Sequence, residues 1–265
     1  MTENKDRNFD DIAEKFAQNI YGSDKGQIRQ TIIWQDLEQM LAQLRSQNPD
    51  KADDKFDVLD AGGGLAQMSQ QVATLGHRVH LCDLSQEMLS IAQREIERQG
   101  LTAQYQVSCQ SIQSLTPAEI SKADLILFHA VMEWLADPEA VLMHLIRHMK
   151  KGAMISVLFY NQHGLVLKNI RCGNIPHILN GMPHKKRFKL QPTQGLYPED
   201  VTRWMQQAQL TPLGKSGIRC VHDYIGDQKY MGDYTAEDVL QLEQQLCRTE
   251  PYASLGRYIH LWGQK

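Results

Sequence analysis

Glycines and two carboxylates are the residues of this chain whose types and spacing best suit ligand chemistry. An apolar run over 56–59 ends in Asp60, and the glycine run 62–64 follows at once. A second apolar run ends in Asp83. Glycine lets a backbone turn sharply and approach a ligand closely, and a carboxylate at the second position can accept hydrogen bonds from ribose hydroxyls. The pattern therefore predicts a site for a cofactor that contains a nucleoside.

The glycine spacing separates two classes of such cofactors. A dinucleotide site has the pattern G-x-G-x-x-G, and here Gln67 stands at its third glycine. The pattern D-x-G-x-G-x-G matches at Asp60, Gly62 and Gly64, with Ala66 in place of the last glycine. This second pattern resembles the first motif of S-adenosylmethionine-dependent methyltransferases. Because S-adenosylmethionine has no phosphate, it needs no pyrophosphate cradle, and we favour it over NAD.

Further candidates end predicted strands, at the edge where ligands bind in a parallel sheet. Asp83 suits a ribose clamp, and the alternative is a helix N-cap, a role that Ser85 fills equally well. His129 is a candidate ligand or an ordinary structural histidine. No acid or histidine stands beside it at ligand spacing, so we expect no metal. Tyr160 and Asn161 are candidate guides for a substrate.

Alternating apolar runs and helical patterns predict the elements that position these residues. Strands are expected at 56–60, 78–83, 103–108, 123–129, 153–160, about 213–222 and 257–262. Helices are expected over 8–46 (with a loop at 21–26), 66–75, 85–99, 137–150, 198–208 and 235–248. This order predicts an α/β fold, doubly wound and Rossmann-like, with a mostly parallel seven-stranded sheet whose last strand is antiparallel. The expected parts of one domain are a helical cap (1–50), a cofactor-binding core (55–160), an insertion after the fifth strand (161–196) and the rest of the sheet (197–265).

Composition narrows the classes of protein. Of the 265 residues, 42% are hydrophobic, enough for a sizeable core, and the formal net charge is -3. A nucleic-acid site must therefore be a local patch. The five cysteines are scattered and form no C-x-x-C, which favours reduced thiols in a cytoplasm. No segment has membrane-spanning length. We expect a cytoplasmic protein without a membrane contact, and leave open whether it is a monomer or a dimer.

A basic run lies inside the expected insertion. It holds four cations in five positions, with Phe188 and Tyr197 nearby: Lys185, Lys186, Arg187 and Lys189. Basic residues bind phosphates and aromatic rings stack on unpaired bases, so the run predicts a contact with RNA. The alternative is an ordinary solvated loop. If the run is idle, Arg171, Lys215 and Arg219 are the next candidates.

Motifs along nearly the whole chain resemble the tRNA 5-carboxymethoxyuridine methyltransferases. Those downstream of the glycine loop are the specific ones, since the loop alone would fit any methyltransferase. The matching segments are RNFDDIAEKF (7–16), NIYG (19–22), LDAGGG (59–64), LCDLS (81–85), LILFHAV (125–131), FYN (159–161), HGL (163–165), GMP (181–183), HDY (222–224) and LGRYIH (255–260).

The resemblance implies a reaction, a cofactor and a set of contacts. The family methylates the carboxylate of 5-carboxymethoxyuridine at the tRNA wobble position and yields the methyl ester, so the partner would be a tRNA anticodon stem-loop. Its S-adenosylmethionine contacts correspond here to Arg29, Gly62, Gly63, Asp83, Ser111, Ile112 and His129. The acid common after the third strand is missing, so a bond to the adenine amino group must come from backbone or from Gln113.

A carboxylate nucleophile asks little of the protein. With an ordinary pKa of about 4 it is already ionised at neutral pH, so no general base is expected and catalysis reduces to positioning and desolvation. Three other functions stay open. They are a methyltransferase for a small metabolite, a NAD-dependent oxidoreductase, which the glycine spacing disfavours, and an RNA-binding module with a structural cofactor.

Overall fold

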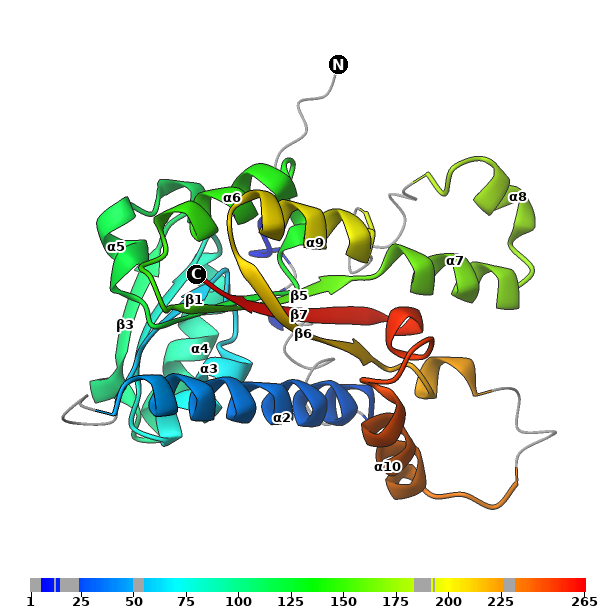
Figure 1. The fold of residues 1–265 in the computed structure, drawn as a ribbon, viewed down its shortest axis with the longest axis horizontal. Helices are drawn as coiled ribbons and strands as arrows, with labels where there is room; N and C mark the ends of the chain where they lie inside the picture. The colour runs from blue at the N-terminus through cyan, green and yellow to red at the C-terminus, as the bar shows by residue number, and fades with distance from the viewer. Residues whose placement is uncertain are drawn as a thin grey trace.

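A seven-stranded sheet with the order β3-β2-β1-β4-β5-β7-β6 forms the centre of the protein (Figure 1). The computed structural model describes residues 6–11, 13–14, 24–49, 55–183, 192, 194–225 and 232–265. The strands are β1 (Asp57–Ala61), β2 (Arg78–Asp83), β3 (Tyr105–Cys109), β4 (Leu125–His129), β5 (Met154–Tyr160), β6 (Thr211–Ile218) and β7 (Tyr258–Gln264). β7 pairs antiparallel with β5 and β6, and the first five strands pair in parallel. The predicted fold class is confirmed, and β7 lies between β5 and β6.

Helices cover both faces of the sheet, which is why its central strands are apolar throughout. Every residue of β5 is buried. One core contains residues of α2 (Asp24–Gln47), α3 (Gln67–Thr74), α4 (Gln86–Arg98) and α10 (Ala236–Leu246). The other contains residues of α5 (Pro117–Lys122), α6 (Pro138–His148) and α9 (Pro198–Gln207). Short 3-10 helices are η1 (Thr102–Gln104), η2 (Ile112–Ser114), η3 (Met132–Trp134), η4 (His222–Tyr224) and η6 (Ala253–Leu255).

Local sequence signals fix several helix starts. Ser85 is the N-cap of α4, and its hydroxyl accepts a hydrogen bond from the Met88 amide at 3.2 Å. Asp137 caps α6 in the same way, followed by a proline at the first helical position. Because Ser85 supplies the cap of α4, the alternative role considered for Asp83 is taken by another residue.

The N-terminal region departs from the predicted helices. α2 begins at Asp24, so residues 24–26 are helical where a loop was expected. Residues 8–11 are not helical. The Arg7 amide donates to the Trp134 carbonyl at 3.1 Å, and Asp10 accepts a hydrogen bond from the Ser85 hydroxyl at 2.6 Å. These contacts with the sheet domain replace the bonds that a helix would have made within the segment.

Two helices follow β5 in the segment that the sequence left without regular elements. α7 (Gln162–Arg171) and α8 (Ile175–Leu179) extend from the carboxyl end of β5 away from the sheet (Figure 1). Their mostly half-buried or exposed side chains give a weak helical pattern, which explains why the prediction missed them. The basic run Lys185, Lys186, Arg187 and Lys189 follows α8 and lies outside the described residues.

Candidate cofactor site

A pocket opens at the carboxyl ends of β1, β2 and β4, where parallel sheets bind ligands. All seven residues that the sequence analysis assigned to the cofactor line it: Arg29, Gly62, Gly63, Asp83, Ser111, Ile112 and His129. They come from α2, from the loops after β1 and β3, and from the last residues of β2 and β4. The fold therefore gathers these seven side chains and backbone positions around one cavity.

The glycine loop requires its glycines for internal reasons as well. Gly62 has φ +72°, and a Cβ there would lie 2.7 Å from a methyl carbon of Val131. A Cβ on Gly63 would lie 2.3 Å from the carboxyl carbon of Asp60. Ala66, which stands for the missing last glycine, adopts φ 58°. It is a non-glycine residue in the left-handed region, which explains why glycine is the family's residue at this position.

Asp83 presents a carboxylate with spare acceptor capacity to the pocket. Its Oδ2 accepts the amide of Gly64 at 2.9 Å, and its Oδ1 accepts the amide of Ser85 at 2.8 Å. An ionised carboxylate offers about four lone-pair sites, so both oxygens can accept a further bond. Burial raises the pKa of Asp83, an effect that these two backbone bonds oppose. This arrangement suits two hydroxyl donors, as on a ribose.

Hydrogen-bond donors gather at another part of the pocket wall. The Arg29 guanidinium donates to Oε1 of Gln67 at 3.0 Å. Nε2 of Gln67 is buried and has no hydrogen-bond partner among the described residues. A buried amide donor without a partner is unfavourable unless a ligand supplies an acceptor. Beside a guanidinium, that acceptor is best an anion such as the carboxylate of an amino-acid group.

His129 ends a buried chain of hydrogen bonds that crosses the sheet. Its Nε2 lies 2.7 Å from the Ser156 hydroxyl, which lies 2.6 Å from Nε2 of His260. Nδ1 of His260 lies 2.8 Å from the carboxylate of Asp36 on α2, and Arg248 donates to the same carboxylate at 2.6 Å. We call this chain (His129, Ser156, His260, Asp36 and Arg248) the buried relay.

The buried relay determines which nitrogen of His129 carries the proton. An Asp36 carboxylate accepts only, so a neutral His260 donates from Nδ1 and accepts at Nε2. The Ser156 hydroxyl then donates to His260, and it accepts from Nε2–H of His129. Nδ1 of His129 is left as an acceptor, and it has no partner among the described residues. Burial lowers the pKa of His129 well below its usual value, in agreement with a neutral ring.

Asp60 lies at the end of β1. Its carboxyl group is buried, and its pKa lies close to neutral pH. Burial raises its pKa to about 7, although the Ser69 hydroxyl donates to it at 2.5 Å. The hydroxyl of Tyr105 donates in turn to Ser69 at 3.1 Å. The Asp60 carboxyl group packs against the backbone of the glycine loop, so closely that a Cβ added to Gly63 would overlap the carboxyl atoms. Asp60 therefore braces the loop.

This raised pKa predicts a specific pH dependence of stability for Asp60→Asn. An unfolded aspartate has a pKa of about 3.9, so between that value and about 7 the folded protein holds one proton more. Stability then falls as pH rises through this window, by about 1.4 kcal/mol per pH unit for this group. The variant cannot ionise there, so its stability relative to the wild type should rise from pH 4 to pH 7 and then level off. Urea denaturation at several pH values measures it, and a pH-independent difference would contradict the assignment.

The N-terminal segment, part of the expected cap, closes part of the pocket with residues that the sequence analysis did not assign to the site. Asp6, Arg7 and Phe9 line it. Asp6 accepts a hydrogen bond from Nε2 of Gln113 at 2.6 Å, and the Phe9 ring packs edge-on against Trp134 at 4.9 Å. Only the resemblance pointed to this segment. The Gln113 side chain lines the pocket with its amide nitrogen bound to Asp6, which leaves its carbonyl oxygen as an acceptor for a donor such as an adenine amino group.

The two candidate substrate guides differ in their surroundings. Both Asn161 amide hydrogens are used, in bonds to the carbonyls of Ser254 (2.9 Å) and Gly256 (2.7 Å), and its oxygen accepts the His163 amide. This side chain connects α7 to the start of β7. Tyr160 keeps a hydroxyl that accepts only a long bond, 3.4 Å, from Arg257. Of the two residues, Tyr160 therefore remains the candidate guide for the substrate.

The described residues also bear on metal binding, membrane insertion and disulfide formation. No three His, Cys, Asp or Glu side chains among them are grouped as a metal site requires. None of their helices is long and apolar enough to cross a membrane. All five cysteines are free.

The sheet order, the glycine loop and the acid that ends β2 define a class I S-adenosylmethionine-dependent methyltransferase. A family model described as "Methyltransferase domain" matches residues 59–157. The fold is similar to magnesium protoporphyrin IX methyltransferase from Synechocystis PCC 6803 with bound S-adenosylhomocysteine, with TM-score 0.62, 14% identity and 97% and 96% of the two chains covered. It is also similar to a putative methyltransferase in complex with the Haloferax volcanii Trm112 activator, with TM-score 0.58, 16% identity and 97% and 95% covered.

Comparison with individual sequences identifies the family within this class. The chain is 44% identical over 261 residues to the tRNA 5-carboxymethoxyuridine methyltransferase of Escherichia coli K12, which covers 98% of this chain and 97% of that protein. A ubiquinone biosynthesis O-methyltransferase of Xanthomonas oryzae is 26% identical over 61% of this chain and 65% of its own length. The chain belongs to the tRNA 5-carboxymethoxyuridine methyltransferase family.

Proposed function

We propose that this protein transfers the methyl group of S-adenosylmethionine to the carboxylate of 5-carboxymethoxyuridine at the wobble position of tRNA, forming the methyl ester. The 44% identity to the Escherichia coli relative carries this proposal, because it extends over nearly all of both chains and so includes the segments outside the common methyltransferase core. The partner would be a tRNA anticodon stem-loop, and the place of action the cytoplasm, where tRNA is modified.

The pocket residues fit this cofactor group by group. The Asp83 carboxylate would take the two ribose hydroxyls, and Arg29 with the partnerless amide of Gln67 would take the methionine carboxylate. Nδ1 of His129 would accept a hydrogen from the ammonium group. Ile112 and its neighbour Ser111 would bound the adenine. Gly62 and Gly63 bring the loop backbone close to the ligand.

Positioning and desolvation supply the catalysis. The bound cofactor supplies a methyl group on a sulfonium, and an ionised carboxylate attacks it without help from a base. The protein's task is to hold the two in line and to exclude water. Tyr160, at the carboxyl end of β5, would orient the substrate by its hydroxyl. The basic run Lys185, Lys186, Arg187 and Lys189 remains a proposed tRNA contact.

The alternatives are less well supported. The family excludes the NAD-dependent oxidoreductase and the RNA-binding module without catalysis. A methyltransferase for a small metabolite shares the cofactor pocket, and the ubiquinone O-methyltransferase relative represents it. That relative matches 61% of this chain at 26% identity, so it gives little support for the remaining segments.

Mass spectrometry of tRNA nucleosides tests the function directly. Purified protein with S-adenosylmethionine should convert 5-carboxymethoxyuridine in tRNA to its methyl ester, and tRNA from a strain that lacks the protein should accumulate the free acid. The Asp83→Ala variant serves as the inactive control. Unchanged nucleosides in both experiments would refute the tRNA substrate, and a panel of small carboxylates and phenols would then decide for the metabolite alternative.

A further inference from the structure

A second hollow lies beyond the carboxyl end of β5. α7, the turn that contains η4 and the first residues of β7 form its walls. It has a volume of about 1130 Å³, against about 160 Å³ for the cofactor pocket on the same measure. We call it the α7 groove. Its size suits a large ligand.

The α7 groove concentrates positive charge. The whole chain has a formal net charge of -3. Among the described residues that line the groove, one is acidic, Asp223, and five are Lys or Arg: Lys25, Lys168, Arg171, Arg219 and Arg257. A concave surface with charge of one sign attracts oppositely charged ligands and accelerates their binding.

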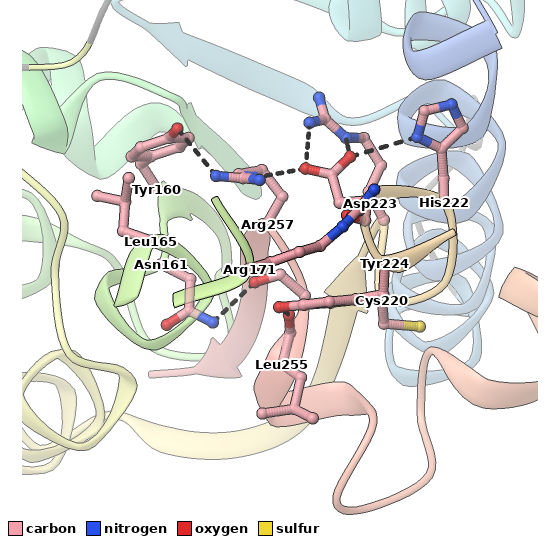
Figure 2. A network of polar contacts seen from close by, with 12 residues as sticks. Tyr160, Asn161, Leu165, Arg171, Cys220, His222, Asp223, Tyr224, Leu255 and Arg257 are labelled. Carbon is pink, nitrogen blue, oxygen red and sulfur yellow. Dashed lines mark hydrogen bonds and ion pairs between the residues drawn. The ribbon is translucent and has the colours of Figure 1, made fainter. Parts of the chain in front are cut away.

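A fixed ion cluster forms the floor of the groove (Figure 2). Asp223 accepts a forked pair of bonds from Arg219, at 2.8 and 2.7 Å, and a third from Arg257 at 2.6 Å. Burial would raise the pKa of Asp223, but the two guanidinium groups hold it well below its usual range. One carboxylate thus meets two arginines, and the cluster keeps an excess positive charge whose side chains cannot swing away.

Hydrogen bonds from elsewhere in the chain hold the turn that carries this cluster in place. The carboxylate of Glu243 on α10 is buried and accepts the backbone amides of Cys220, Val221 and His222, at 2.9, 3.0 and 2.8 Å. The Tyr224 hydroxyl donates to the Leu255 carbonyl at 2.6 Å. The turn that carries Asp223 is therefore anchored on both sides, so the groove is preorganised.

Two cationic side chains of α7 also line the groove, and both have unused hydrogen-bond donors. Arg171, which lines the groove, donates one Nη1 hydrogen to the Asp223 carbonyl at 2.5 Å. The Lys168 ammonium is exposed and has no hydrogen-bond or ion-pair partner within the described part of the chain. Burial against the groove wall and the nearby charge of Arg257 lower the pKa of Lys168. A bound anion would offset the repulsion from Arg257.

Two tyrosines, at the carboxyl end of β5 and at the start of β7, line the α7 groove. The rings of Tyr160 and Tyr258 meet edge-on at 5.2 Å. Arg219 lies 5.9 Å from the Tyr258 ring. Burial raises the pKa of Tyr258, and the positive charges of Arg29, from the cofactor pocket, and of Arg219, from the groove, both oppose the rise. Both rings therefore belong to the wall of the groove.

We infer that the α7 groove binds the sugar-phosphate backbone of the tRNA anticodon loop, with Lys168 and Arg171 as the phosphate contacts. This inference rests on the proposed function and assigns the surface that the substrate uses. Arg219 and Arg257 hold the floor in shape and supply its positive potential.

The structure also separates the sequence candidates for an RNA surface. Arg171 and Arg219 line the α7 groove. Lys215 on β6 does not, since its ammonium is paired with the Glu250 carboxylate and donates to the Ser254 hydroxyl at 3.1 Å. A neutralised lysine has little to offer a phosphate, and we assign no RNA contact to Lys215.

The test is a double variant, Lys168→Gln/Arg171→Gln, in the full-length protein. Its matched control is Arg147→Gln/Lys151→Gln, which removes the same charge from exposed positions beside the amino-terminal end of β5. Each lost phosphate contact should weaken tRNA binding by about tenfold. The log-log salt slope should flatten by about 0.7–0.9 per contact. The KM for tRNA should rise by the same factor as the dissociation constant, with S-adenosylmethionine affinity unchanged by calorimetry.

The outcomes separate this inference from the proposed function. If wild-type protein methylates tRNA and the groove variant keeps wild-type tRNA affinity and salt slope, the groove is not the RNA surface and the function stands. An equal loss in the control pair would also overturn the inference, because net charge alone would then explain it. If wild-type protein neither binds nor methylates tRNA that carries 5-carboxymethoxyuridine, the proposed function fails and the inference with it.

Discussion

Asp83→Ala is expected to weaken S-adenosylmethionine binding by about a hundredfold or more. The variant removes a carboxylate that would accept two ribose hydroxyls, and hydrogen bonds to charged groups contribute about 1.5–3 kcal/mol each. Since about 1.4 kcal/mol corresponds to tenfold in affinity, two such bonds account for the factor. The carboxylate also holds the amides of Gly64 and Ser85, so part of the loss comes from a loosened glycine loop. Isothermal titration calorimetry measures the affinity.

Two companion variants define what the loss means. Asp83→Asn keeps one acceptor oxygen without the charge and should bind the cofactor with intermediate affinity. Asp57→Ala removes an acid from the opposite end of β1, where it is paired with Arg78 at the surface, and should bind normally. A folded Asp83→Ala protein with wild-type affinity would show that the ribose is held elsewhere. A thermal melt verifies that each variant is folded.

Much of the cofactor pocket could be predicted because it depends on local sequence. A βαβ unit fixes where the glycine loop and Asp83 stand relative to each other, and the apolar runs of β1, β2 and β4 set the edge at which they meet. Ser111 and Ile112 follow β3, but only the resemblance to a family assigned them to the cofactor. Arg29 lies outside this unit, and only the resemblance to a family indicated that α2 would bring it to the pocket.

The groove and the buried relay could not be predicted, because distant segments build them. Asp223 meets Arg257 only through the pairing of β6 with β7, and Arg171 reaches it from a helix that the sequence did not reveal. His129 looked like a lone histidine for the same reason. Its partners lie on β5 and β7, and no spacing along the chain connects them.

Asp36→Ala is expected to lower the free energy of unfolding by about 3–5 kcal/mol. Asp36 is fully buried, and its carboxylate is bound to Arg248 and His260. Burial would raise its pKa, but these two partners bring it below the usual value. Removing one member of a buried ion pair leaves the other charge uncompensated, and this typically costs that amount. Urea denaturation compares it with Asp57→Ala, whose surface pair with Arg78 contributes about 0–1 kcal/mol. Equal effects of the two variants would contradict the prediction.

Ser156→Ala separates the relay's effect on the cofactor from its effect on stability. The ion pair of Asp36 stays intact, while His129 loses the acceptor that keeps its proton on Nε2. Nitrogen NMR of the cofactor-free protein should show wild-type His129 with its proton on Nε2, and in Ser156→Ala a mixture of the two tautomers. Because a proton on Nδ1 faces the cofactor's ammonium as a donor against a donor, S-adenosylmethionine affinity should fall together with the population of the Nε2–H form. A variant with mixed tautomers and unchanged affinity would show that His129 does not bind the ammonium group.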